Sequence, residues 1–214
     1  LAPHMRITLD VKTPITAFSG ALDTLKLFAN LRKGMLPHFY SINCEAANLG
    51  APAMRPLLLE CENDMAARNA NQQYMLGSQI MVAPVMNKDN KVMYYVPAGV
   101  WTNLLTREKV KGPCYRNITA DSNNIPILVK PNSIVTSWSP EANTFGDPLN
   151  NLTFTVFELE NGSVAAFEVF SENAEHSGLI NILKQGNKIT VRTDGLGQNK
   201  RIVLSGIKNV VSVS

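Results

Sequence analysis

The chain has 214 residues, of which 45% are apolar and 17% charged, and its formal net charge is +3. This is the composition of a globular protein with enough apolar residues for one large core or two small ones, and it argues against a disordered chain. The 20 lysines and arginines are scattered, so we expect no nucleic-acid partner, and no apolar run approaches the roughly 20 residues of a membrane span.

The first 19 residues carry weak structural signals. Residues 1–5 resemble the remnant of an expression tag, and residues 7–11 predict a short extended arm that Pro14 closes.

Two helices are predicted between residues 20 and 49. Apolar residues recur there at three- and four-residue steps, starting with Leu22, Leu25 and Phe28. Pro37 falls inside this run, so we expect a break just before it, with Pro37 in the first turn of a second helix. Gly50 supplies the C-terminal stop.

Residues 54–85 predict a buried β-α-β passage. The run 54–60 contains three consecutive leucines, so both faces of a strand there would need cover. In the polar turn that follows, Asn63 or Asp64 could cap a helix over residues 65–77. Residues 80–85 then predict a second short buried strand.

Past Pro84 the pattern becomes one of short strands separated by turn residues, which is typical of a sandwich or barrel. The residues between Val96 and Val100 and those around Gly112 predict turns, and residues 139–151 predict a long surface loop. A second β unit is expected to start near Phe170. The predicted strands are 92–96, 100–105, 114–118, 125–129, 133–136, 152–159, 164–169, 179–183, 188–192, 201–204 and 210–213.

The three cysteines, Cys44, Cys61 and Cys114, are widely separated. This spacing argues against a disulfide framework and against a zinc site, and it favours a reducing, cytoplasmic setting. The histidines also lack metal-ligand spacing, so we expect neither a metal nor another cofactor, and we expect His38 to pack in its helix.

Six motifs along the chain share their order and approximate spacing with one enzyme family. They are LPHFY at 36–40, MRP at 54–56, QYMLG at 73–77, MVAPV at 81–85, YVPAGVWT at 95–102 and IPILVKPNSI at 125–134. In these motifs the chain resembles glycoside hydrolase family 31, whose members are retaining α-glycosidases. Its KPNS sequence at 130–133 resembles that of the α-xylosidase branch.

The resemblance implies an α+β, mainly β fold. Residues 1–19 would be the tag remnant and arm, and residues 20–84, with the N-terminal helices and the last β/α unit, would end a truncated (β/α)8 barrel. An antiparallel proximal β-sandwich would follow at 85–169 and a small distal β domain at 170–214. Residues 54–60 would be the final barrel strand. Because such barrels place their chemistry at the C-terminal ends of the strands, Glu60, Cys61 and Glu62 would lie at the barrel rim.

The catalytic residues implied by the family are missing from this sequence. A retaining glycosidase needs two carboxyl groups about 5 Å apart, and neither of the family's two aspartate motifs occurs here. We therefore expect a C-terminal fragment of a retaining α-glycosidase that acts on α-linked xylosides or glucosides. It would complete and brace the barrel and be inactive alone. Its partners would be the rest of that barrel and the glycoside or oligosaccharide substrate. The alternative is a non-catalytic β-sandwich module for carbohydrate binding or scaffolding.

Each candidate residue also has a structural interpretation. Glu60 and Glu62 could form an acid/base pair, but a helix cap or a rim contact explains this acidic turn more simply. Cys61 could be a nucleophile, but a buried thiol is the better interpretation because no basic residue is close in sequence. Trp101 and Trp138 could stack on sugars, whereas the family resemblance favours Trp101 as a domain-interface anchor.

An isolated final barrel strand would leave its edges unpaired. We therefore expect residues 54–59 to be covered, either by the N-terminal helices or by a second copy of the chain in a homo-oligomer.

Overall fold

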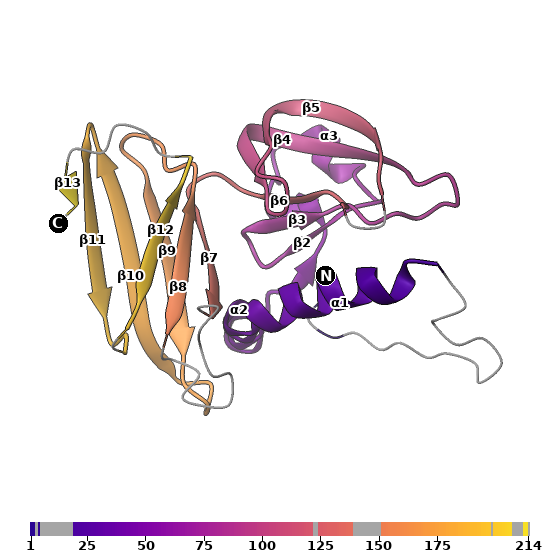
Figure 1. Ribbon diagram of the computed structural model, residues 1–214. Helices are drawn as coiled ribbons and strands as arrows, with labels where there is room; N and C mark the ends of the chain where they lie inside the picture. The colour runs from indigo at the N-terminus through magenta and orange to yellow at the C-terminus, as the bar shows by residue number, and fades with distance from the viewer. Residues whose placement is uncertain are drawn as a thin grey trace.

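The computed structural model describes residues 1–2, 4, 19–121, 124–138, 151–197, 199–206 and 212–213. Two β units lie on either side of a helix, and strands make up most of the regular secondary structure (Figure 1). The predicted arm at 7–11 and nearly all of the loop predicted at 139–151 lie outside the described residues. No helix in the described part of the chain is long and apolar enough to cross a membrane.

The two predicted N-terminal helices are confirmed. Helix α1 spans Ala21–Gly34 and helix α2 spans Leu36–Leu49, with Pro37 in the first turn of α2. Gly50 ends α2 in the left-handed conformation, with φ 72°, and its N–H donates to the Ala46 carbonyl at 2.9 Å. Helix α1 has no fully buried residue, whereas α2 buries side chains along its length. Helix α2 is therefore the one that organises the packing.

The strand predicted at 54–60 is wrong beyond its first two residues. Strand β1 covers only Met54–Arg55, and a 3-10 helix, η2, follows at Leu57–Leu59. Pro56 cannot donate a backbone hydrogen bond to a neighbouring strand, and its carbonyl accepts from the Leu59 N–H at 3.1 Å. The chain therefore turns here instead of extending.

The helix predicted at 65–77 is also much shorter than expected. Helix α3 covers only Met65–Arg68, and strand β2 at Tyr74–Leu76 stands where the last helical turn was expected. Strand β2 pairs with β1 on one side and with β3, Ile80–Val82, on the other. The hydrogen bonds that β2 makes on both of its edges outweigh the weak helical preference of the polar residues that precede β2.

The first β unit is a six-stranded sheet in the order β1-β2-β3-β6-β4-β5. Its longest members are β4 at Lys91–Asn103 and β5 at Lys109–Thr119, and β6 is Ile127–Val129. Because β3 pairs with β6, the sheet crosses the boundary expected at residue 84, and the segment assigned to the barrel shares this sheet.

The turn predicted between Val96 and Val100 is a bulge inside β4. The β4–β5 register shifts between Val96 and Gly99, and pairing resumes opposite Gly112. Gly99 has φ +111°, which other residues rarely adopt, and a Cβ on Gly112 would collide with the Pro97 carbonyl oxygen. Both glycines therefore serve close packing within a continuous strand pair, and the turn predicted around Gly112 is wrong as well.

The second β unit is a sandwich of two sheets, with orders β12-β8-β7 and β13-β11-β10-β9. Strand β9 pairs with β10, so one sheet crosses the boundary expected near Phe170. Most pairs are antiparallel, but β12 runs parallel to β8 and β13 parallel to β11. The strands are β7 Ser133–Trp138, β8 Leu152–Phe157, β9 Val164–Phe170, β10 His176–Gln185, β11 Lys188–Asp194, β12 Arg201–Ser205 and β13 Ser212–Val213.

Three apolar clusters hold these layers. One joins η2 and α3 to β4 around Trp101, and another fills the sandwich around Phe154 and Ile180. In the third, Phe39 and Ile42 of α2 pack against the first sheet together with Phe157 of the sandwich. Figure 1 shows α2 in this position between the two β units. Helix α2 thus belongs to the packing of both.

Candidate functional site

Glu60, the first of the three rim candidates, is held by cations. The η2 turn brings its carboxylate back to Arg55, with Glu60 Oε1 3.0 Å from Arg55 Nη1. Lys130 Nζ lies 3.9 Å from the other oxygen. The Glu60 side chain is only 13% exposed. A carboxylate enclosed in this way ties segments of the chain together and is not placed to exchange protons with a substrate.

Arg55 is the centre of this ion cluster. Its side chain is 7% exposed, and its second guanidinium nitrogen lies 3.3 Å from Glu45 Oε1 on helix α2. The cluster of Arg55, Glu45, Glu60 and Lys130 therefore connects α2, β1, the turn after η2 and the residue that follows β6. We call it the Arg55 cluster.

Cys61 and Glu62, the other two rim candidates, have no catalytic geometry. Cys61 packs at the edge of the Trp101 cluster, and burial raises the pKa of its thiol, which suppresses the reactive thiolate. The Glu62 side chain is exposed and makes no hydrogen bond or ion pair within the described residues, although its backbone carbonyl accepts from Arg68 at 3.5 Å. The partial burial of Cys61 agrees with its interpretation as a structural thiol.

The acidic turn also supplies the cap of α3. Asp64 is the residue that does so, accepting from the backbone N–H groups of Ala66 at 2.9 Å and Ala67 at 3.4 Å. Its second oxygen accepts from the Tyr95 hydroxyl at 2.6 Å. Burial first, and then this bond to Asp64, raise the pKa of Tyr95, so the hydroxyl stays protonated and keeps donating. The expected cap is confirmed, and it also fixes Tyr95.

Trp101 presents no open ring to a sugar, and Trp138 is partly covered. Trp101 is 1% exposed, packs with Leu57 and Ala67 in one cluster, and donates from Nε1 to the Pro97 carbonyl at 3.1 Å. It therefore lies where the segment before residue 84 meets strand β4, and not between the two β units. Trp138 is half-buried and lines an apolar cavity of about 200 Å³ beside Tyr40 of α2.

His38 is buried, as predicted, but it packs beyond its own helix. Its ring stacks on Phe167 of β9, with centroids 5.2 Å apart and planes at 16°. Nδ1 accepts from the Thr136 N–H of β7 at 3.5 Å, while Nε2 has no partner in the described structure. Burial lowers the pKa of His38 to about 4, so the ring is neutral at pH 7. This role between helix and sandwich leaves no signal in the sequence.

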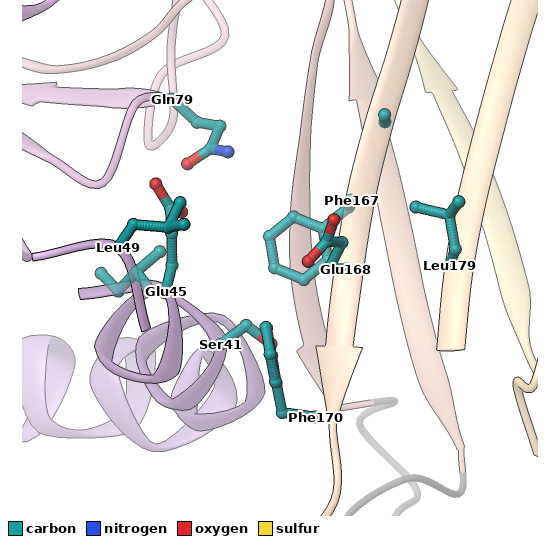
Figure 2. Close-up of a pocket in the computed structure, with 10 residues that line it drawn as sticks. Ser41, Glu45, Leu49, Gln79, Phe167, Glu168, Phe170 and Leu179 are labelled. Atoms are coloured by element: carbon teal, nitrogen blue, oxygen red, sulfur yellow. The ribbon is translucent and has the colours of Figure 1, made fainter. Parts of the chain in front are cut away.

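A cavity of about 220 Å³ opens between α2 and β9. Figure 2 shows Ser41 and Glu45 of the helix on one side, Phe167 and Glu168 of β9 on the other, and Gln79 above them. Glu45 already belongs to the Arg55 cluster. Within the described part of the chain no group of three or more histidine, cysteine or acidic residues could hold a metal ion. The cavity carries no arrangement that performs chemistry.

Comparisons with known proteins match two consecutive segments of the chain to two separate family models. The family model described as the glycosyl hydrolase family 31 C-terminal domain matches residues 50–135. The model described as the C-terminal domain of α-xylosidase YicI matches residues 149–214. The two matches leave the N-terminal helices outside.

Two curated relatives are much longer than this chain. An α-xylosidase of Lactiplantibacillus pentosus is 26% identical over 198 residues, which are 91% of this chain and 26% of that protein. Alpha-glucosidase 2 of Bacillus thermoamyloliquefaciens is 29% identical over 71% of this chain and 19% of its own length. The chain therefore spans about a quarter or less of these relatives.

Solved structures share the fold. A dextranase of Flavobacterium johnsoniae, solved with glucose, superposes with a TM-score of 0.71 at 23% identity, covering 86% of this chain and 25% of that one. An α-xylosidase from Xanthomonas citri gives a TM-score of 0.70 at 20% identity, covering 90% and 23%. The architecture of two β units around α2 is thus a known one.

Proposed function

Because the chain belongs to glycoside hydrolase family 31 and corresponds to its C-terminal part, we propose that it completes and braces the catalytic barrel of a retaining α-glycosidase. The parent enzyme would act on α-linked xylosides or glucosides, with an α-xylosidase-like preference. The match of residues 149–214 to an α-xylosidase C-terminal domain supports that preference. The three unpaired cysteines are consistent with a reducing, cytoplasmic location.

The observation that carries this proposal is the Arg55 cluster. It holds β1, η2 and α2 together at the point where the chain would join the rest of a barrel. Glu60, one of the rim candidates, is engaged by Arg55 and Lys130, which supports a structural role for its carboxylate. The bracing role therefore accounts for the buried charges, which catalysis by this chain does not.

The open edge of β1 is the proposed attachment site. Among the described residues, strand β1 ends the sheet order and pairs with β2 alone. Met54 in β1 and Leu59 in η2 are 42% and 57% exposed, and Glu45 connects α2 to Arg55 of the same strand. In the intact enzyme the remaining barrel would cover this edge, and in its absence a second copy would do so. Light scattering on the purified chain tests the second case, since a monodisperse monomer contradicts it.

We expect the purified chain to leave aryl α-xylosides and aryl α-glucosides unhydrolysed. The reason is the missing pair of carboxyl groups that a retaining glycosidase needs about 5 Å apart. The measurement is release of the aryl group over a long incubation. The matched comparison is the same chain expressed in one reading frame with its own upstream coding sequence, which should hydrolyse at least one of the two substrates.

Two outcomes would contradict the proposal. Turnover by the isolated chain that survives repurification would mean that a catalytic pair lies within these residues. An upstream sequence without the two aspartate motifs would mean that the chain serves a non-catalytic protein, which is the binding or scaffolding alternative.

A further inference from the structure

A shallow groove of about 80 Å³ lies where the loop at residues 69–73 meets strands β4 and β5. None of its lining side chains carries a charge. They are Asn69, Ala70, Asn71, Gln72, Gln73, Met93, Tyr95 and Tyr115. The groove thus combines amides with two aromatic rings, and nothing in the bracing role of the chain requires that combination at the surface.

The loop is held in place by one buried amide. The Gln73 side chain donates from Nε2 to the Tyr95 carbonyl at 2.8 Å and accepts on Oε1 from the Tyr95 N–H at 2.7 Å. These two bonds imitate the pairing of a strand with β4, and Gln73 is only 7% exposed. The wall of the groove is therefore formed before any ligand arrives, which lowers the entropic cost of binding.

The opposite wall is an exposed tyrosine ring. Tyr115 stands directly across from Tyr95 in the β4–β5 register, and the two ring centroids are 5.0 Å apart. Tyr95 is fixed by its hydroxyl bond to Asp64 and supports the neighbouring ring. Tyr115 itself is 61% exposed and Met93 is 59% exposed. A supported aromatic ring of this kind offers an apolar platform to a ligand.

Three free amides surround this platform. Asn69, Asn71 and Gln72 are exposed, and their side chains make no hydrogen bond within the described part of the chain. Each amide can donate and accept at once, which matches hydroxyl groups that do the same. An aromatic face packs on the C–H groups of a sugar ring as it packs on other apolar surfaces.

Other ligand classes fit the groove less well. A nucleic acid would need lysines and arginines for its phosphates, and the lining has none. A stable protein partner buries roughly 800 Å² on each side, far more than this small patch provides. From the uncharged lining, the free amides and the Tyr115 ring, we propose that the groove between residues 69–73 and Tyr115 binds a neutral saccharide. Saccharide binding in this groove requires no hydrolysis. A negative binding result would therefore leave the proposed function untouched, and the absence of hydrolysis would leave the binding proposal untouched.

The test is an NMR titration of the ¹⁵N-labelled 214-residue chain with isomaltotriose at millimolar concentrations. We expect saturable shifts confined to residues 69–73 and to the neighbourhood of Met93 and Tyr115. Tyr115→Ala should weaken the affinity roughly tenfold, because about 1.4 kcal/mol of ring contact corresponds to that factor. Tyr115→Phe keeps the ring and should bind within about twofold of the wild type.

The NMR spectrum of each variant also reports whether that variant is folded. Asn71→Ala removes one of the free amides and keeps the Tyr115 ring, and we expect it to lower the affinity as well. The proposal is overturned if no shifts occur, if they fall elsewhere, or if Tyr115→Ala binds as well as the wild type. An equal response at these residues to a capped, uncharged tripeptide would also overturn it, because the groove would then not select hydroxyl groups.

Discussion

Replacing Arg55 with methionine will lower the free energy of unfolding by about 3 kcal/mol, the loss typical of removing one partner from a buried ion pair. Methionine preserves much of the apolar stem but leaves Glu60, 13% exposed, with only the distant Lys130 as its partner. It also removes the link to Glu45 on α2. Urea unfolding at neutral pH, followed by circular dichroism, measures the loss.

The matched control is Arg116→Met, which removes the same charge from an ion pair of the same length. Arg116 lies 3.0 Å from Glu108, but the two side chains are 41% and 58% exposed. Such surface pairs contribute about 1 kcal/mol or less. Equal losses for the two variants would mean that the Arg55 cluster is not the brace inferred from its burial.

The second large effect is a loss of stability in acid that depends on His38. In the unfolded chain this histidine titrates near the ordinary pKa of 6.5, whereas in the folded chain burial lowers its pKa to about 4. Between these values the unfolded state binds more protons, so stability falls as the pH drops from 6.5 towards 4. The difference corresponds to about 3 kcal/mol at most.

The measurement compares the wild type with His38→Gln by urea unfolding at neutral pH and near pH 4. Glutamine can still accept from the Thr136 N–H but does not titrate, so the acid-induced loss should be smaller by up to about 3 kcal/mol. Carboxyl groups that titrate in the same pH range affect the wild type and the variant alike. Their contribution therefore cancels when the acid-induced loss of the variant is subtracted from that of the wild type. The control is His176→Gln, which removes an exposed imidazole instead of a buried one. Parallel curves for His38→Gln and the wild type would contradict a buried neutral His38.

Local patterns in the sequence predicted some elements well. The break before Pro37 and the stop at Gly50 rest on backbone chemistry that acts within one or two residues, and both are confirmed. Strands β9 and β10 show the expected alternation of burial, although one predicted turn lies inside β4 as a bulge. Where short-range chemistry decides the backbone, the sequence is sufficient.

The passage from Met54 to Gly77 shows where such reasoning fails. Its apolar and polar runs predicted a strand and a long helix, but Pro56 interrupts the first and the pairing of β2 with two neighbours replaces the end of the second. The family resemblance does not require a strand over all of residues 54–59. The family models match the chain although η2 occupies half of that run.

The candidate site was predicted only in part. Glu60 and Cys61 do lie in the turn after the leucines, and the cap at Asp64 follows from local capping rules. The partners that decide their roles, Arg55 and Lys130, reach Glu60 only through tertiary packing. The contact of His38 with Phe167, 129 positions away, leaves no periodic trace in the sequence.

The place of α2 also bears on where this chain can be divided. The two family models begin at residue 50 and at residue 149, and both leave out the helix. Yet Phe39 and Ile42 complete the packing of the first sheet, and His38 fills the face of the sandwich. Each matched segment is therefore an incomplete folding unit by itself, and the segment covered by either family model is smaller than the unit that packs together.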